Sequence, residues 1–451
     1  MRTTFHLKTL AVAIATLSVA SAASAAGLDR SGQDVTAFFQ DGTYAEAVYT
    51  YIDADVSGYD SANTDPSDND YERGDKTGDI AESYDFFRYG VKADINDTFS
   101  VGILYDEPFG AAAEYTQSNF VASDNLGESF GELVADGVDQ QTAGAVATAE
   151  ATAAGENTNV EVRSQSLTGM LGMKFGANKN FQVYGGPVAQ RIQADTKLRG
   201  LAYGPASGYT STSNPDMDYG YIAGIAYYKP EIALKAALTY RSEIDHDIQI
   251  SEYYPLAGIR TEAGALQQGA TAEQAAALRV AAENRNSKYE ITTPKSVNFD
   301  FQTGINPTTL ATAKVRWVPW SDFVITPPLY NDTSKISYGP DGLNLVEYED
   351  DQWMVELGLA KRVAPALAIS GTVGWDSGAG DPTTSLGPVD GYYSVGLGAK
   401  YNFTENWAVS AGGKYLWFGD AQGQLPSDKI VADFEDNDGF IAGVKLSYQG
   451  E

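Results

Sequence analysis

The stretch WAVSAGGKYLW, residues 407–417, decides the fold of this chain. Alternate residues of a strand point to opposite faces, so one face of this stretch is apolar and aromatic while the other is polar. The apolar face holds Trp407, Val409, Ala411, Tyr415 and Trp417, and the opposite face holds Ser410 and Lys414. The two tryptophans would lie about 33 Å apart along a strand, or about 24 Å apart across a membrane if the strand tilts by about 45°. This spacing matches the ~25 Å apolar band, flanked by aromatic girdles, of an outer-membrane barrel.

The same alternation recurs along most of the chain. Tyr393 and Phe403 repeat the aromatic spacing, and residues 231–246 alternate clearly, although a soluble sandwich would show that alternation too. The pattern predicts fourteen strands, an even number, as bacterial barrels have. The predicted strands are 44–58, 82–96, 98–112, 158–175, 180–198, 218–229, 231–250, 291–303, 308–323, 346–361, 366–376, 390–402, 406–419 and 437–449.

The predicted connections alternate between short and long. The short ones are 96–97, 176–179, 229–230, 304–307, 362–365 and 404–405, and the long ones are 59–81, 113–157, 199–217, 251–290, 324–345, 377–389 and 420–436. Short periplasmic turns and long extracellular loops are typical of outer-membrane barrels, whereas a β-propeller would not sort its loops by length. We therefore expect an all-β fold, a 14-stranded antiparallel transmembrane β-barrel with both termini at the periplasmic end.

Composition excludes several functions. The 451 residues include 60 Asp and Glu against 30 Lys and Arg, a formal net charge of −30, and no Cys. The acid excess argues against a nucleic-acid partner, because phosphate binding needs a basic surface. The absence of Cys excludes disulfides, thiolate catalysis and Cys-ligated metals. Length alone would suggest two or three soluble domains, but the strand pattern argues for a single barrel instead.

The N-terminus reads as an export signal followed by a plug. Arg2 and Lys8 precede an apolar run over 10–20 and a small-residue cleavage site at 23–25, while an anchor helix is the alternative. No later apolar run is long enough for a membrane helix, so a membrane location would require a barrel. The expected organisation is a signal peptide over 1–25, an N-terminal hatch over 26–43 and a barrel over 44–451. A disordered leader is the alternative for the apolar segment 27–43.

Strand parity points several basic side chains into the lumen. These inward-facing candidates for binding a ligand carboxylate are Arg88, Lys92, Lys235, Arg241, Lys314 and Arg316. Pairing with inward acids such as Glu243, Asp300 and Glu356 is the open alternative for each of them.

Three segments carry a resemblance to a known family. Residues 104–115 (LYDEPFGAAAEY), 167–190 (LTGMLGMKFGANKNFQVYGGPVAQ) and 294–323, with the run Trp317-x-x-Trp320-Ser321-x-Phe323, resemble the FadL/TodX family of outer-membrane transporters of long-chain fatty acids and other hydrophobic compounds. The opening GLDRSGQ, residues 27–33, is most similar to one branch of that family. The resemblance covers essentially the whole chain after the signal.

The resemblance implies passive uptake through a plugged barrel. Ligand would enter a groove among the extracellular loops, reach a pocket in the barrel and leave sideways where the third strand kinks. Pro108, flanked by Gly102 and Gly110, would mark that kink, because proline cannot donate a ladder hydrogen bond. The short hatch lacks the Asn-Pro-Ala signature of better-known members, and residues 449–451 would overhang the last strand.

The alternatives to a transporter are an enzyme, a diffusion porin and a calcium-binding protein. An enzyme would depend on His246, read as a surface residue between Asp245 and Asp247, and we expect none. A diffusion porin for small solutes is the main alternative. The seven acidic residues within 59–81 lack EF-hand spacing, so no metal and no cofactor are expected. The expected partners are a hydrophobic ligand, outer-membrane lipid and lipopolysaccharide, and the chain is expected to be a monomer.

Residues 271–283 should form a loop helix with a capping box at Thr271 and Gln274. This helix would either shield a ligand entrance or merely lie in solvent.

Overall fold

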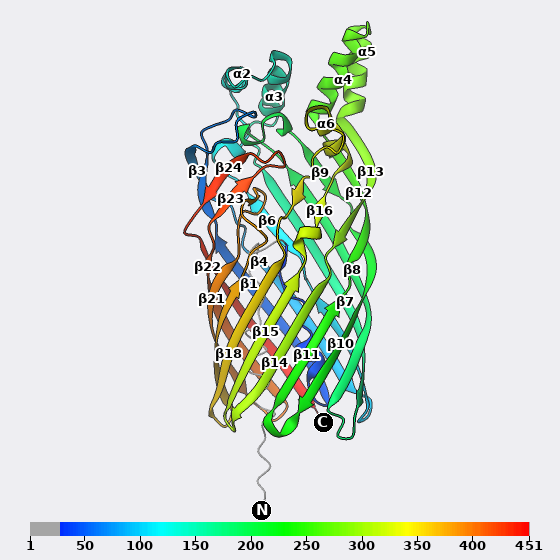
Figure 1. The fold of residues 1–451 in the computed structure, drawn as a ribbon, viewed down its shortest axis with the longest axis vertical. Helices are drawn as coiled ribbons and strands as arrows, with labels where there is room; N and C mark the ends of the chain where they lie inside the picture. Colours follow the sequence, from blue (N-terminus) through cyan, green and yellow to red (C-terminus); the bar gives the residue numbers. More distant parts are fainter. Residues whose placement is uncertain (1–27, 451) are drawn as a thin grey trace, which may run out of the picture.

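The computed structural model describes residues 28–450 and folds them into one closed antiparallel β-barrel (Figure 1). The expected signal peptide and its cleavage site lie outside these residues. The wall has fourteen strands, which confirms the predicted fold class. The barrel closes because β1 pairs with both the second wall strand and the last, β4 and β25. No helix in the described part of the chain is long and apolar enough to cross a membrane.

Ten wall strands are continuous. They are β1 (Thr43–Asp55), β4 (Tyr84–Asp94), β7 (Asn159–Phe175), β8 (Phe181–Lys197), β15 (Thr309–Val318), β18 (Gln352–Ala364), β19 (Leu367–Asp376), β21 (Tyr392–Asn402), β22 (Trp407–Phe418) and β25 (Asp438–Gly450). The other four are each interrupted once, as β5 (Phe99–Asp106) and β6 (Gly110–Glu114), β9 (Thr210–Ser213) and β10 (Asp216–Lys229), β11 (Leu234–Arg241) and β12 (Ile244–Tyr253), and β13 (Asn284–Thr293) and β14 (Ser296–Asn306). Three of these interruptions contain a proline, Pro108, Pro215 or Pro294, which cannot donate to a ladder.

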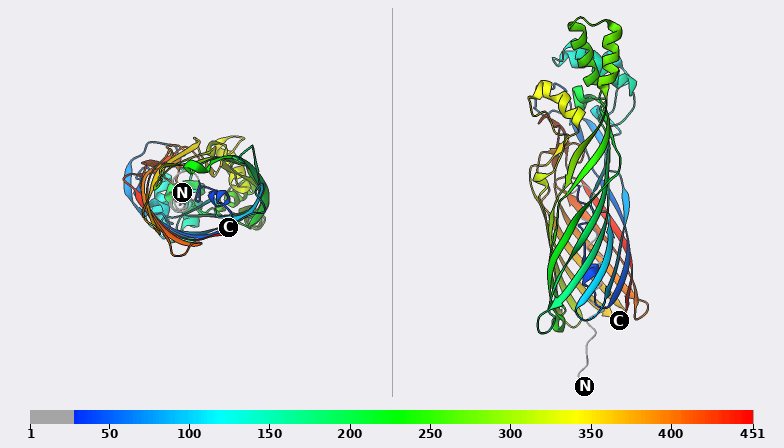
Figure 2. Two further views of the ribbon diagram at one scale, coloured as in Figure 1. Left: turned by 90° about the horizontal axis from the view of Figure 1, so that it is seen from below. Right: turned by 90° about the vertical axis from the view of Figure 1, so that its right-hand side faces the viewer.

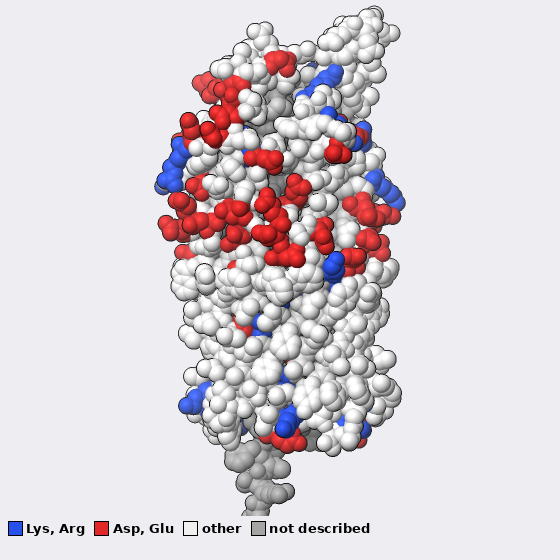
Figure 3. All heavy atoms as spheres, viewed as in Figure 1, with Lys and Arg blue, Asp and Glu red and all other residues white. Residues whose placement is uncertain are grey.

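The outer wall carries the predicted apolar band. Trp407 and Trp417 of β22 are 40% and 49% exposed, and Trp407 packs on Tyr448 of β25 with ring centroids 5.1 Å apart. Figure 3 shows a largely uncharged belt bounded by a dense acidic band toward the long loops. Exposed acidic residues on the wall strands include Asp55, Asp85, Asp245, Asp247 and Glu290. The acid excess thus gathers at the long-loop end and on the wall just below it.

The long loops build a cap over one end of the barrel. It contains a five-stranded sheet of β20 (Thr383–Thr384), β23 (Ala421–Gln424), β24 (Ile430–Phe434), β2 (Ser57–Ser61) and β3 (Arg73–Asp79), and a small pair of β16 (Val324–Ile325) and β17 (Val346–Glu347). The α-helices of the cap are α2 (Leu126–Ala135), α3 (Gln140–Thr152), α4 (Pro255–Gln267), α5 (Ala272–Glu283) and α6 (Pro328–Tyr338). The 3-10 turns of the chain are η1 (Thr36–Phe39), η2 (Ser118–Phe120), η3 (Leu201–Ala206), η4 (Pro230–Ile232) and η5 (Trp320–Asp322).

The structure confirms one predicted loop helix and corrects the ends of three predicted strands. The predicted helix is α5, with its capping box formed between Thr271 and Gln274. The expected strands 308–323 and 346–361 are too long, because η5 replaces the end of the first and β17 separates from the start of the second. Gln449 and Gly450 do not overhang but pair with Tyr44 and Thr43 as part of β25.

The N-terminal segment, residues 28–42, occupies the barrel interior. Figure 2 shows it as a dark-blue trace inside the ring of strands. Val35, Phe38 and Phe39 are buried and pack in one apolar cluster with Tyr184 of β8 and Ile222 of β10. A second, larger apolar cluster fills the long-loop half of the barrel and its cap.

Candidate functional site

The wall of the barrel has a gap in strand pairing between β4 and β6. The β4–β5 ladder runs from Asp94↔Ser100 to Tyr89↔Tyr105 and stops there. Beyond it, strand pairing between these neighbours resumes only at the isolated bridge Ala81↔Ala113. Residues 84–88 of β4 therefore face residues 107–111 with no strand pairing between them in the described structure. Pro108 lies in this break and Gly110 begins β6.

Gly102 has a different role from the one expected. It lies inside the regular ladder of β5, opposite Lys92 of β4 and Met170 of β7, and does not flank the break. A Cβ atom at this position would lie 2.8 Å from a ring carbon of Phe38. Gly102 therefore makes room for the N-terminal segment.

The N-terminal segment covers the gap from inside. The amide of Gly110 donates to the carbonyl of Leu28 (2.9 Å), and the amide of Arg30 donates to the carbonyl of Pro108 (2.8 Å). The hydroxyl of Ser31 donates to Asp106 (2.5 Å). Residues 28–31 thus pair with the inner side of the broken strand and satisfy backbone groups that β4 leaves free.

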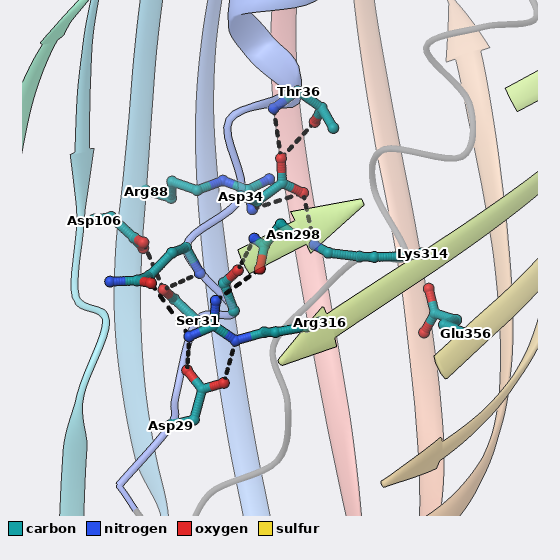
Figure 4. Close-up of polar contacts among 12 residues, drawn as sticks. Asp29, Ser31, Asp34, Thr36, Arg88, Asp106, Asn298, Lys314, Arg316 and Glu356 are labelled. Carbon is teal, nitrogen blue, oxygen red and sulfur yellow. Dashed lines mark hydrogen bonds and ion pairs between the residues drawn. The ribbon is translucent and has the colours of Figure 1, made fainter. Parts of the chain in front are cut away.

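Buried charges hold this segment in place (Figure 4). Arg316 binds Asp29 through two nitrogen atoms, at 2.5 and 3.1 Å, and both side chains are buried. Asp34 lies 3.5 Å from Arg88 and 3.6 Å from Lys314. Burial alone would raise the pKa of Asp34, but the charges of Lys314 and Arg88 outweigh burial and hold this pKa below its usual value.

The predicted lumen cations therefore meet the N-terminal segment in this structure. Lys92 donates to the carbonyls of Gln40 (2.6 Å) and Gly42 (3.0 Å), and Lys235 donates to the carbonyl of Phe39 (2.8 Å). Arg241 is the exception, since its guanidinium donates a hydrogen bond to the hydroxyl of Thr168 (3.1 Å). Of the three acids named as alternative partners, Glu356 forms a buried ion pair with Lys414. Glu243 is exposed instead of facing inward, and it pairs with Lys295. A ligand role for the six cations stays a prediction.

An apolar cavity adjoins the gap. It has a volume of about 30 Å³, room for one or two water molecules, so a larger ligand needs side chains to move. Leu28 and Ala111 line it next to the broken strand. Its other apolar side chains are Val160, Val162, Ala194, Ile250, Tyr289, Ile325, Pro327, Leu345, Val346, Tyr348 and Leu386.

The loop 377–391 and Pro327, which directly precedes helix α6, line this cavity as well. The hydroxyls of Tyr115 and Tyr203 lie 2.6 and 2.9 Å from the carbonyl and hydroxyl oxygens of Ser385. The carboxylate of Glu252 accepts hydrogen bonds from the amides of Leu329 and Tyr330 at the start of α6. A second cavity, of about 320 Å³ and lined by Lys92, Lys174 and Lys235 among others, lies on the short-turn side of the N-terminal segment.

His246 is not the surface residue that the sequence suggested. It is fully buried, because position 246 of β12 faces the barrel interior while Asp245 and Asp247 face outward. Its Nε2 lies 3.1 Å from the amide oxygen of Gln190 and its Nδ1 lies 3.5 Å from Asp216. In residues 28–450, no group of three or more His, Asp or Glu side chains is arranged to hold a metal ion.

A family model shows the relationship of the chain. The model of the outer membrane protein transport protein family (OMPP1/FadL/TodX) matches residues 18–448. The chain belongs to the FadL/TodX family. This FadL/TodX protein is thus an outer-membrane protein, and members of its family are transport channels for hydrophobic compounds. None of the curated proteins compared with it matches.

Solved structures share the fold of this FadL/TodX protein. A FadL homologue of Pseudomonas aeruginosa is 16% identical, with 91% of each chain covered and a TM-score of 0.63. The Pseudomonas putida toluene transporter TodX is 11% identical, with 91% of each chain covered and a TM-score of 0.53. The Ralstonia pickettii toluene transporter TbuX is 11% identical, covers 94% of this chain and 95% of its own, and has a TM-score of 0.51.

Proposed function

We propose that this FadL/TodX protein takes up long-chain fatty acids or other hydrophobic molecules and releases them sideways through the barrel wall. The observation that carries this proposal is the juxtaposition of an apolar cavity with the β4–β6 gap, which residues 28–31 cover from inside. The long-loop end faces the exterior, following the rule for bacterial barrels.

The sideways route follows from the energetics of apolar chains. Each CH₂ group removed from water contributes about 0.8 kcal/mol. A ligand that moves from the apolar cavity directly into lipid keeps that contribution, whereas exit through the lysine-lined short-turn cavity would expose the chain to water. Movement of residues 28–31 away from the break would join cavity and membrane.

An engineered, reversible disulfide at the edge of the gap tests lateral release. The chain has no Cys, so an Ala81→Cys, Ala113→Cys pair would form one defined disulfide at the antiparallel bridge that borders the gap. We expect its oxidation to slow uptake of a radiolabelled fatty acid by about tenfold, and reduction to restore it. The matched control is Ala93→Cys, Val101→Cys, a partner pair within the regular β4–β5 ladder. Equal uptake by the oxidised and reduced gap variants would contradict lateral release.

The same proposal distinguishes this chain from a diffusion porin. The N-terminal segment and the cap occlude the lumen, so we expect little conductance in a planar lipid bilayer. Large, stable open channels that a fatty acid does not block would favour the porin function instead.

We also propose that the chain acts as a monomer, with its apolar belt against outer-membrane lipid and lipopolysaccharide. Light scattering in detergent would show a dimer if that is wrong.

We propose no catalytic role for His246. Its side chain is sealed from solvent, with Nε2 on the amide oxygen of Gln190 and Nδ1 beside Asp216, so a substrate has no access to the ring. His246→Gln should therefore leave uptake unchanged within twofold, or about 0.4 kcal/mol. Ligand turnover by the wild type that this variant abolishes would overturn the proposal.

A further inference from the structure

Lys400 of β21 is a buried cation without a carboxylate partner among residues 28–450. Its side chain faces the barrel interior, and the residue is only 4% exposed. No Asp or Glu of these residues lies within 4.0 Å of its Nζ, and the neighbouring charge that acts on it is a second cation, Lys445 of β25. A buried charge is destabilising until an opposite charge or several hydrogen bonds compensate it. Lys400 therefore lacks the counter-charge that a buried cation requires.

Lys445 lies two strands away in the same cross-strand row. Lys400 pairs with Ser410 of β22 in the register of the sheet, and Ser410 pairs with Lys445. Directly paired residues of antiparallel strands have Cβ atoms about 4.5–5.5 Å apart, so these three inward side chains are close neighbours. Lys445 lies 3.4 Å from Glu46 of β1, but Glu46 also lies 3.5 Å from Arg88. Two cations thus share Glu46, which leaves no negative charge for Lys400.

The wall beside this row carries no side chains on its inner face. The next inward row, toward the long-loop end, consists of three glycines that pair across β21, β22 and β25, namely Gly398, Gly412 and Gly443. Their positions extend nothing toward the lumen, so the lysine row borders a stretch of bare backbone. A small ion beside the lysines would meet no side chain from these three positions.

Two hydroxyl groups next to the lysines have no hydrogen-bond partner among the described residues. They belong to Ser410, between the two lysines, and to Ser370 of β19, which pairs with Gly398 and so continues the glycine row. Both side chains are buried. A buried hydroxyl is destabilising until it finds a partner, and it can donate to an anion. Donors from four strands therefore gather here around an uncompensated positive charge.

We propose that Lys400, Lys445, Ser370 and Ser410 form a binding site for a small inorganic anion, with chloride as the expected occupant. One monovalent anion matches the one lysine of the row that has no carboxylate. A spherical ion accepts hydrogen bonds from any direction, which suits donors on four different strands. The site is separate from the proposed cargo route, because no residue of β19, β21, β22 or β25 lines the apolar cavity at the gap. The bound ion would neutralise a charge inside the wall and so stabilise the folded barrel.

The dependence of stability on the anion tests this site. The full chain in detergent is heated at fixed pH in sodium chloride or in sodium gluconate, and the midpoint of unfolding is read from the loss of compact migration on gels. Both salts are used at about 500 mM, so that general screening of charges is the same. We expect chloride to raise the midpoint of the wild type by about 5 °C, because an ion that binds only the folded state stabilises it.

Lys400→Met is the decisive variant, because it removes the uncompensated cation and keeps an unbranched side chain. We expect it to lose the chloride effect and, in gluconate, to unfold no earlier than the wild type, since it buries no unpaired charge. Ser410→Ala should raise the chloride concentration that gives half of the shift by a few-fold. The matched control is Lys361→Met, on the exposed outer face of β18, which should keep the full chloride shift.

Bromide locates the ion directly. Crystals of the wild type soaked in sodium bromide should show an anomalous scattering peak within hydrogen-bond distance of the Nζ of Lys400, and crystals of Lys400→Met should not. Equal midpoints of the wild type in chloride and gluconate would overturn the site, because Lys400 would then need no anion. A chloride shift that persists in Lys400→Met would overturn it as well, since the ion would bind elsewhere.

Discussion

At the scale of single residues, the interior of this barrel is organised by pairs that lie far apart in the sequence. Asp29 and Arg316 are 287 positions apart, yet they form a bidentate ion pair shielded from water. Local patterns predicted that Arg316 faces the lumen but could not predict its partner, because strand parity gives a direction and no distance. The same holds for Lys235, whose partner is a backbone carbonyl of Phe39.

The Asp29–Arg316 pair should control the seating of the N-terminal segment. Removing one partner of a buried ion pair leaves an uncompensated charge, which typically costs about 3–5 kcal/mol. Arg316→Gln should lower the free energy of unfolding in urea by about this amount and raise conductance in planar bilayers. Lys414→Gln is the control, because it also breaks a buried ion pair, with Glu356 of β18, whose partners both belong to the wall. Equal conductance changes in both variants would contradict the anchoring role.

Gly102 offers a second residue-scale test. A methyl group there would lie 2.8 Å from Phe38 and 3.1 Å from the carbonyl of Val91. Gly102→Ala should therefore destabilise the barrel by about 1–3 kcal/mol, the range for overpacked sites. Gly371→Ala in β19 is the control, since its nearest contacts are at 3.7 Å. Urea unfolding measures both, and a Gly102→Ala barrel as stable as the Gly371→Ala barrel would show that Phe38 moves freely.

At the scale of elements, the sequence predicted strands better than it predicted what the loops contain. Each predicted strand corresponds to a wall strand, since outward apolar residues alternate with inward polar ones. Helix α5 was predicted from its capping box, but α3 was missed because its buried residues are mostly alanines, which give no periodic apolar signal. Of the breaks in four wall strands, the sequence predicted only the one at Pro108. The other three were not predicted, because the alternation of polar and apolar residues continues across them.

Helix α6 depends on one carboxylate from another element. Glu252 of β12 accepts the amides of Leu329 and Tyr330, and therefore acts as the N-terminal cap that α6 itself lacks. Glu252→Ala should weaken α6 by about 1–2 kcal/mol, which corresponds to trypsin cleavage after Lys335 about 5–30-fold faster. Glu273→Ala, in the exposed first turn of α5, should leave that cleavage rate unchanged. A protected Lys335 in the Glu252 variant would show that packing alone holds α6.

At the scale of the whole molecule, the two ends of the barrel differ in both length of connection and charge. Helices and a small sheet cap one end, while tight turns close the other (Figure 1). The acidic band of Figure 3 lies on the capped half, above the uncharged belt. Loop length and the acidic band therefore predict the same orientation, with the capped end outside the cell.

Epitope tags can test this orientation in intact cells. A tag inserted at Gly269, between α4 and α5, should bind antibody on intact cells, whereas a tag at Asn178, in the β7–β8 turn, should bind only after the outer membrane is permeabilised. A difference of more than about tenfold in labelling is expected. Labelling of Asn178 on intact cells would reverse the orientation.

The charges around the N-terminal segment also bear on how the barrel is assembled. Arg88 of β4, Glu46 of β1 and Lys445 of β25 form a line of charges across the seam where the last strand meets the first, and Asp34 joins it from inside. Without the segment, Arg88 would lose Asp34, and of the acids that act on it only Glu46 and Asp106 of the wall would remain. Closing the wall around a seated segment is therefore electrostatically more favourable than closing it around an empty lumen.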